Sequence, residues 1–161
     1  MINKLIEIIG REAGLFESFL ALLEQQKKML VSNDLDGLNL VTDRQREKLV
    51  ESQLLGNERE QLIERIKVAN AIEGDLNVTR LLEMVDENQA ERLLHLKSLI
   101  YGLHDQIAEV RNQNAMLLNR SRQYIGKMME MLSRVNSPEG AYSSGGVTTS
   151  ENSTVAVDRR A

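Results

Sequence analysis

Residues 93–135 read LLHLKSLIYGLHDQIAEVRNQNAMLLNRSRQYIGKMMEMLSRV, and their pattern decides the fold. Along this stretch, positions spaced alternately three and four residues apart are apolar throughout, except for two polar residues. We call these positions the seam: Leu93, Leu96, Ile100, Leu103, Ile107, Val110, Asn114, Leu117, Ser121, Tyr124, Met128, Met131 and Val135. A heptad pattern of this length predicts one long helix that packs along other helices at roughly 20°.

Two further long helices are predicted before this stretch. Residues 2–32 carry a regular apolar stripe: Ile9, Ala13, Phe16, Leu20, Leu23 and Leu30. Residues 37–70 carry a poorer one, in which Gln45, Ser52 and Arg59 interrupt a row that includes Leu38, Val41, Leu49 and Leu55. Side-chain oxygens favour the residue before a helix, so Asp36 is the expected N-cap of the second helix.

The connection that follows contains Gly74, and Asn77 is the expected N-cap of a short helix over residues 78–85. We expect a break at DENQ (86–89) and a last helix over residues 90–135. Residues 136–161 are rich in Ser, Thr and Gly and show no apolar period, which predicts a flexible tail.

Composition agrees with an all-α fold. Aromatic residues make up 3% of the chain, there is one proline, and there is no cysteine, so neither a disulfide nor a thiolate metal site is available. We predict an elongated antiparallel bundle of two to three long helices plus a short helix, with residues 1–135 as the bundle domain. No signal peptide or membrane-spanning run is evident.

The sequence offers little for catalysis. His95 and His104 are nine residues apart on one predicted helix and face opposite ways, and no Gly-rich phosphate loop is present. We therefore expect no enzyme activity, no cofactor and no metal. A net charge of -4 argues against nucleic acid as the main ligand. The basic patch of Arg111, Arg120, Arg122 and Lys127 is explained as well by the polar face of a helix.

Helix lengths point to a partner-binding segment. At 1.5 Å per residue the first two helices span roughly 46 and 50 Å and the last roughly 69 Å, which leaves about 20 Å without an internal partner. That segment contains Met128, Met129 and Met131, and flexible Met side chains suit adaptable docking surfaces. Asn114 and Ser121 have two explanations that remain open here: buried polar residues that fix register, or parts of a docking face that stays soluble when empty.

Three stretches resemble the FlgN-like flagellar export chaperones. They are LLEQQKKMLVSNDLDGLNLVTDRQREKLV (22–50), RNQNAMLLNRSRQYI (111–125) and AYSSG (141–145), and together they extend over most of residues 1–145. The resemblance implies a cytoplasmic helical chaperone. Such a chaperone binds the helical ends of hook–filament junction (hook-associated) proteins and delivers them to the flagellar type III secretion apparatus.

The resemblance also implies site residues. The substrate-binding C-terminal region of the family corresponds here to Asn114, Leu117, Leu118, Tyr124, Ile125, Met128 and Leu132, to which the unpartnered segment adds Met131. The tail tyrosine associated with the export gate corresponds to Tyr142. Two other functions remain as alternatives: a self-associating coiled-coil scaffold, in which the segment pairs with its own copy as a homodimer, and a regulatory adaptor.

Overall fold

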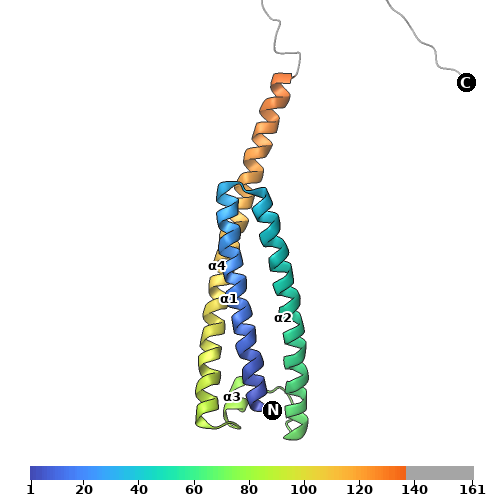
Figure 1. Cartoon of the computed structure of the whole chain (residues 1–161), viewed down its shortest axis with the longest axis vertical. Coiled ribbons are helices and arrows are strands. Elements are labelled where there is room, and N and C mark those ends of the chain that lie inside the picture. Colours follow the sequence, from blue (N-terminus) through green and yellow to red (C-terminus); the bar gives the residue numbers. More distant parts are fainter. Residues whose placement is uncertain (137–161) are drawn as a thin grey trace, which may run out of the picture. The chain divides into compact units, whose positions relative to one another are not determined.

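The computed structural model describes residues 1–136, and this part of the chain contains four helices (Figure 1). Their bounds are α1 Ile2–Ser32, α2 Leu35–Ala69, α3 Val78–Leu82 and α4 Glu87–Asn136. The described part of the chain divides into two units, residues 1–122 and residues 123–136, and the boundary falls inside α4. The all-α prediction is confirmed, and the long helices begin and end within three residues of the predicted positions.

The turn between α1 and α2 is made by two adjacent residues. Asn33 adopts a left-handed conformation, with φ 54°, and its N–H donates to the Leu30 carbonyl. The N–H of Asp34 donates to the Met29 carbonyl at 3.0 Å, which completes a Schellman motif and ends α1. Asp34 then accepts a hydrogen bond from the Gly37 N–H at 2.9 Å and starts α2.

The predicted N-cap Asp36 was therefore wrong. Asp34 is the N-cap, and Asp36 lies in the first turn of α2, where a negative charge is favourable. The helix begins two residues earlier than expected because the Schellman turn leaves Asp34 extended, with its carboxylate over the open end of α2. A Cβ at Gly37 would come too close to the Asp34 carboxylate and the Met29 sulfur, so these two side chains would have to shift.

Side-chain caps also organise the connection from α2 to α4. Asn77 accepts from the Arg80 N–H at 2.9 Å, as predicted, but α3 ends at Leu82 rather than at residue 85. Asp86 accepts from the Gln89 N–H at 2.8 Å, and Gln89 accepts from the Asp86 N–H at 3.3 Å. This reciprocal capping box starts α4 directly after Asp86. The helix therefore begins at Glu87 rather than at Ala90, and the break lies before Asp86 instead of at residues 86–89.

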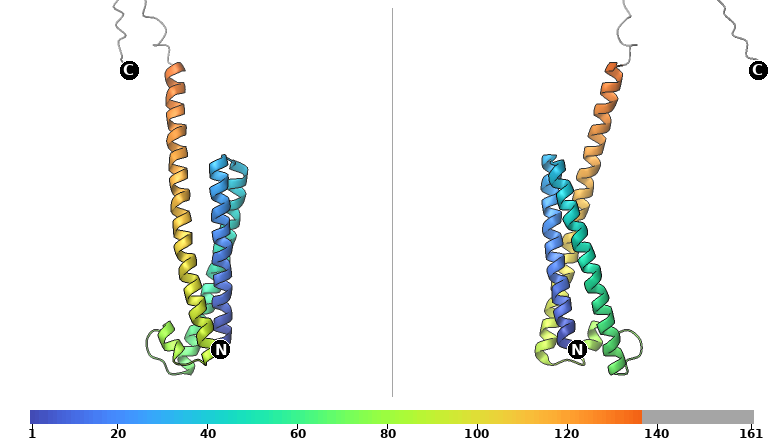
Figure 2. Two further views of the ribbon diagram at one scale, coloured as in Figure 1. Left: turned by 90° about the vertical axis from the view of Figure 1, so that its left-hand side faces the viewer. Right: turned by 45° about the vertical axis from the view of Figure 1, so that its right-hand side comes forward.

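The core of residues 1–122 is concentrated toward one end. Figures 1 and 2 show α1 and α2 running antiparallel, with α3 close to the end where α1 begins. The buried cluster there draws on all four helices: Leu5, Ile6, Ile8, Leu15, Leu55, Leu62, Ile66, Leu81 and Leu93. Ion pairs flank this core, including one between Arg59 Nε and Glu12 Oε1 at 3.0 Å. This cluster is a connected group of buried apolar side chains, and its burial stabilises the fold.

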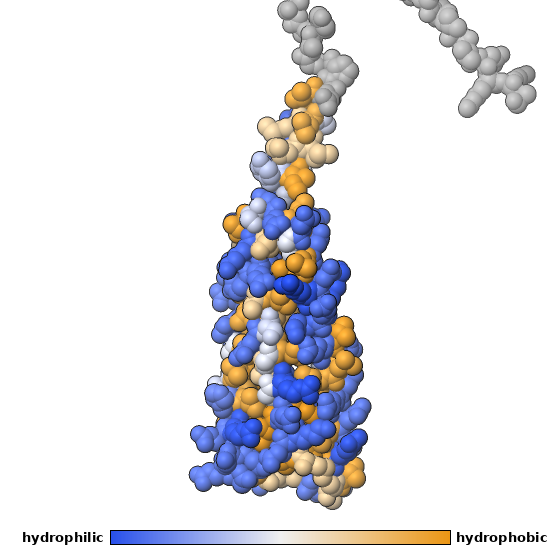
Figure 3. Space-filling view, viewed as in Figure 1, coloured by the Kyte–Doolittle hydropathy of each residue, from blue (hydrophilic) through white to orange (hydrophobic). Residues whose placement is uncertain are grey.

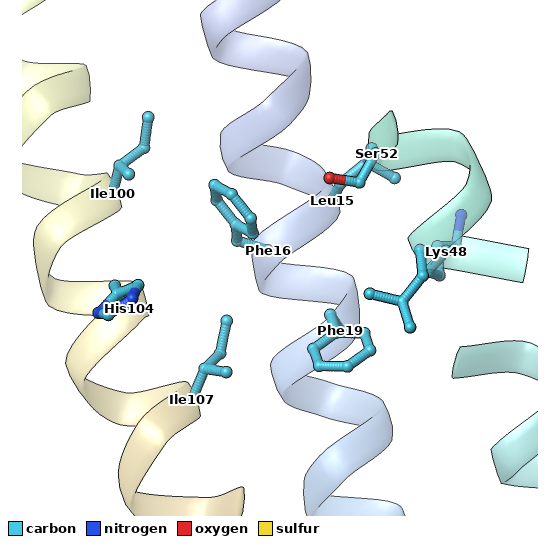
Figure 4. Close-up of a pocket in the computed structure, with 9 residues that line it drawn as sticks. Leu15, Phe16, Phe19, Lys48, Ser52, Ile100, His104 and Ile107 are labelled. Atoms are coloured by element: carbon cyan, nitrogen blue, oxygen red, sulfur yellow. The ribbon is translucent and has the colours of Figure 1, made fainter. Parts of the chain in front are cut away.

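The other half of the bundle is less well packed. The face of α2 that meets α1 continues from Leu55 through Ser52, Lys48 and Gln45, so polar residues replace the apolar side chains of the core. Leu49, which we expected in this stripe, lies beside it and is 57% exposed. A cavity of about 180 Å³ lies here (Figure 4), and the residues that line it are Leu15, Phe16, Phe19, Lys48, Leu49, Ser52, Ile100, His104 and Ile107.

Candidate partner-binding surface on helix α4

The seam of α4 is buried as far as Asn114. Leu93, Leu103 and Val110 are buried, and the seam positions between them are partly buried. The alternation of three and four therefore describes how α4 packs inside residues 1–122, as the sequence predicted.

Asn114 belongs to this internal packing. It is 3% exposed, and its Nδ2 donates to the Leu23 carbonyl and to Gln26 Oε1, both at 2.9 Å. Gln26 Nε2 in turn donates to Gln45 Oε1 at 3.4 Å. Gln26, Gln45 and Asn114 thus form a polar layer that joins α1, α2 and α4. A buried amide with these partners fixes the register of a helix, so we exclude Asn114 from the candidate surface.

The polar layer is incompletely satisfied. Among the described residues, Asn114 Oδ1 and Gln45 Nε2 have no hydrogen-bond partner, although both atoms are buried. Beside the layer, Lys27 Nζ donates to Gln113 Oε1 at 2.7 Å. These contacts hold α4 against α1 through polar groups, which stabilise less than a tightly packed apolar layer of the same size.

Beyond Ser121 the side chains of the seam become exposed. We call six residues of this part of α4 the distal apolar surface, and their exposed fractions are Tyr124 66%, Ile125 59%, Met128 45%, Met131 67%, Leu132 56% and Val135 81%. Figure 3 shows apolar side chains along this end of the helix. Leu117 is partly buried and Leu118 is 41% exposed, and both lie in the last turns of the first unit. Met129, also in this segment, is 64% exposed.

One row of residues along α4 is polar before Leu118 and apolar from Leu118 onward. Residues seven apart lie on nearly the same face of a helix. In the part of α4 that packs inside the bundle, the row next to the seam is polar: Lys97, His104 and Arg111. The same row continues as Leu118, Ile125 and Leu132. The apolar face therefore becomes one row wider close to where the seam becomes exposed, and this change can be seen in the sequence itself.

The other predicted residues divide as follows. Tyr142 lies outside the described residues, and so does the predicted tail apart from Asn136, which ends α4. His95 and His104 are exposed side chains of α4. Within residues 1–136, no three His, Asp or Glu side chains are grouped closely enough to hold a metal ion. Tyr124, Ile125, Met128, Met131 and Leu132 are the predicted partner-binding residues that lie together on one helix face in the second unit.

None of the helices in residues 1–136 combines the length and apolar character of a membrane span.

No curated protein matches the chain, and no solved structure does. The sequence model of the family described as FlgN protein matches residues 1–150, which is most of the chain. The chain therefore belongs to the FlgN family, whose members are flagellar export chaperones.

Proposed function

We propose that this chain is a cytoplasmic chaperone that binds the helical termini of hook–filament junction proteins on the distal apolar surface. The bound proteins would then be delivered to the flagellar type III secretion apparatus. One observation carries the proposal: large apolar side chains occupy one face of α4 between Tyr124 and Val135, and each is between 45% and 81% exposed. A soluble monomer rarely exposes a contiguous apolar patch without a binding role.

The shape of the surface favours a helical partner. Tyr124, Met128 and Met131 continue the seam by which α4 packs on helices within residues 1–122. A partner helix can use the same alternating pattern, and helix-on-helix docking reads positions i, i+3, i+4 and i+7. Ile125 and Leu132 widen this face, so a partner buries more apolar area than the seam alone would offer.

The methionines suit a surface that receives more than one partner. Met side chains are unbranched and polarizable, and they adjust to irregular contacts at low cost. Met128, Met129 and Met131 are all exposed in this short segment. Leu117 and Leu118 also remain proposed partner-binding residues, and Tyr142 is proposed to dock at the export gate.

Calorimetry with purified hook–filament junction proteins tests the proposal. We expect Tyr124→Ala combined with Met128→Glu to weaken binding at least a hundredfold, because it removes an aromatic anchor and places a charge in an apolar contact. The matched control is Met116→Glu, which changes the same residue type at a 58% exposed position on another face of α4.

The control should bind like wild type, and circular dichroism should show equal helicity for all three proteins. Unchanged affinity in the double variant would remove this surface from the function. Light scattering distinguishes the scaffold alternative: a tight dimer that ignores the junction proteins would favour self-association through the same face.

A further inference from the structure

Basic side chains gather beside the distal apolar surface. Residues 110–136 contain five Lys or Arg and one Glu, a net charge of +4, whereas the whole chain carries -4. The one acidic residue, Glu130, is paired with Arg134 at 2.6 Å. Arg120, Arg122 and Lys127 are exposed, and they form no ion pair with any residue of 1–136. Within residues 1–136, this end of α4 therefore carries positive charge that no ion pair compensates, in a chain whose net charge is negative.

These charges lie along both borders of the apolar face. On one border, Arg120 is four residues before Tyr124, and Lys127 is four residues before Met131. On the other border, Arg122 is three residues before Ile125. Side chains three or four residues apart are neighbours on a helix surface, so each cation stands next to an apolar contact residue. In paired helices such flanking positions form the ion pairs that select the partner.

We propose that the occupant of the distal apolar surface is an amphipathic helix whose apolar stripe is bordered by Asp or Glu on both sides. This inference rests on the proposed function and adds the chemistry by which the site selects a partner. The apolar stripe supplies most of the affinity. The acidic borders pair with Arg120, Lys127 and Arg122, which speeds association and rejects helices with basic borders.

The basic side chains beside the distal apolar surface disfavour a second copy of the chain or a nucleic acid as its occupant. Two antiparallel copies of this segment would place Arg120 and Lys127 of one copy against the same cations of the other, and like charges at flanking positions disfavour pairing. A nucleic acid would neutralise the cations, but it would leave the exposed row of Ile, Met and Leu between them without a partner. An acidic amphipathic helix satisfies both the charges and the apolar face.

The experiment uses the full chain and two synthetic helical peptides with one Leu stripe, bordered by Glu in one peptide and by Lys in the other. Calorimetry at 50 and 300 mM NaCl should show at least tenfold tighter binding of the Glu-bordered peptide at low salt. The preference should shrink at high salt, because salt screens exposed ion pairs. Arg120→Glu combined with Lys127→Glu should weaken the Glu-bordered peptide roughly tenfold and strengthen the Lys-bordered one.

The matched control is Arg44→Glu combined with Arg65→Glu, which makes the same change in net charge at exposed cations of α2 that form no ion pair within residues 1–136. This control should keep the peptide preference of wild type. Equal binding of the two peptides, binding of neither, or the same loss in the control would overturn the charge inference. So would dimerisation of the free chain that Met128→Glu abolishes, since the occupant would then be a second copy.

Failure of the charge inference and failure of the proposed function give different results. If only the inference fails, the junction proteins still lose affinity with Tyr124→Ala plus Met128→Glu but not with the charge reversals. If the proposed function fails, the junction proteins bind the Tyr124→Ala plus Met128→Glu variant as they bind wild type.

Discussion

The polar layer predicts that Asn114 stabilises the bundle and does not contact cargo. Replacing Asn114 with Ala removes both hydrogen bonds donated by Nδ2, to the Leu23 carbonyl and to Gln26 Oε1, each 2.9 Å long. A net contribution of about 1 kcal/mol for each bond gives a loss of about 2 kcal/mol. The change also removes a buried oxygen without a partner among the described residues, and it raises helix propensity.

These two gains offset part of the loss. Replacing Asn with Ala in a helix gains roughly 0.5 kcal/mol from propensity alone. We therefore expect the unfolding free energy of Asn114→Ala to fall by about 1 to 1.5 kcal/mol. The matched control is Asn119→Ala, an exposed residue on the same helix for which no side-chain hydrogen bond is seen within residues 1–136. It should gain up to about 0.5 kcal/mol, so the two variants should differ by about 2 kcal/mol.

Urea unfolding followed by circular dichroism at 222 nm measures this difference. A melting experiment should show the same order, with a gap of roughly 6 °C for a unit of this size. Equal stability of the two variants would refute the reasoning, because the amide would then contribute nothing beyond helix propensity. Binding to the junction proteins should stay within about twofold of wild type when assayed well below the melting temperature. A loss of affinity without a loss of stability would instead return Asn114 to the binding surface.

Two other substitutions test the packing by urea unfolding. Gly37→Ala should destabilise by about 1 kcal/mol or more despite its better helix propensity, because the new Cβ meets the Asp34 carboxylate and the Met29 sulfur. Its control, Gly56→Ala, has open space around the new Cβ and should gain up to about 1 kcal/mol; equal effects would contradict the tight turn. Ser52→Leu adds carbon atoms into the cavity of about 180 Å³ and should stabilise by about 1 kcal/mol, whereas a lower urea midpoint would show that the cavity cannot accept them.

Local signals were sufficient for most of the secondary structure. The seam predicted α4, and Asn77 was recognised as a cap because a side-chain oxygen before a helical run has a local effect. The sequence D-E-N-Q also contains the capping box of α4, which places the start of the helix at Glu87. That Asp34 and not Asp36 caps α2 depends on the left-handed turn at Asn33, which the local pattern of the sequence does not reveal.

Which residues of α2 face α1 could not be predicted as well from the sequence. Leu49 matched the expected stripe by hydrophobicity, but Gln45, Lys48 and Ser52 occupy the positions that face α1. The cavity beside them is a consequence of three helices meeting, so no single stripe of the sequence contains it.

Burial along the seam shows what only tertiary structure decides. Asn114 and Met128 are fourteen residues apart and occupy equivalent positions of one heptad pattern, yet Asn114 is 3% exposed and Met128 is 45% exposed. The sequence alone determined that both lie on the same face of a long helix, because periodicity follows from local backbone geometry. Whether a given position on that face is buried is decided by contacts between residues distant in the chain, such as the hydrogen bond from Asn114 to the Leu23 carbonyl.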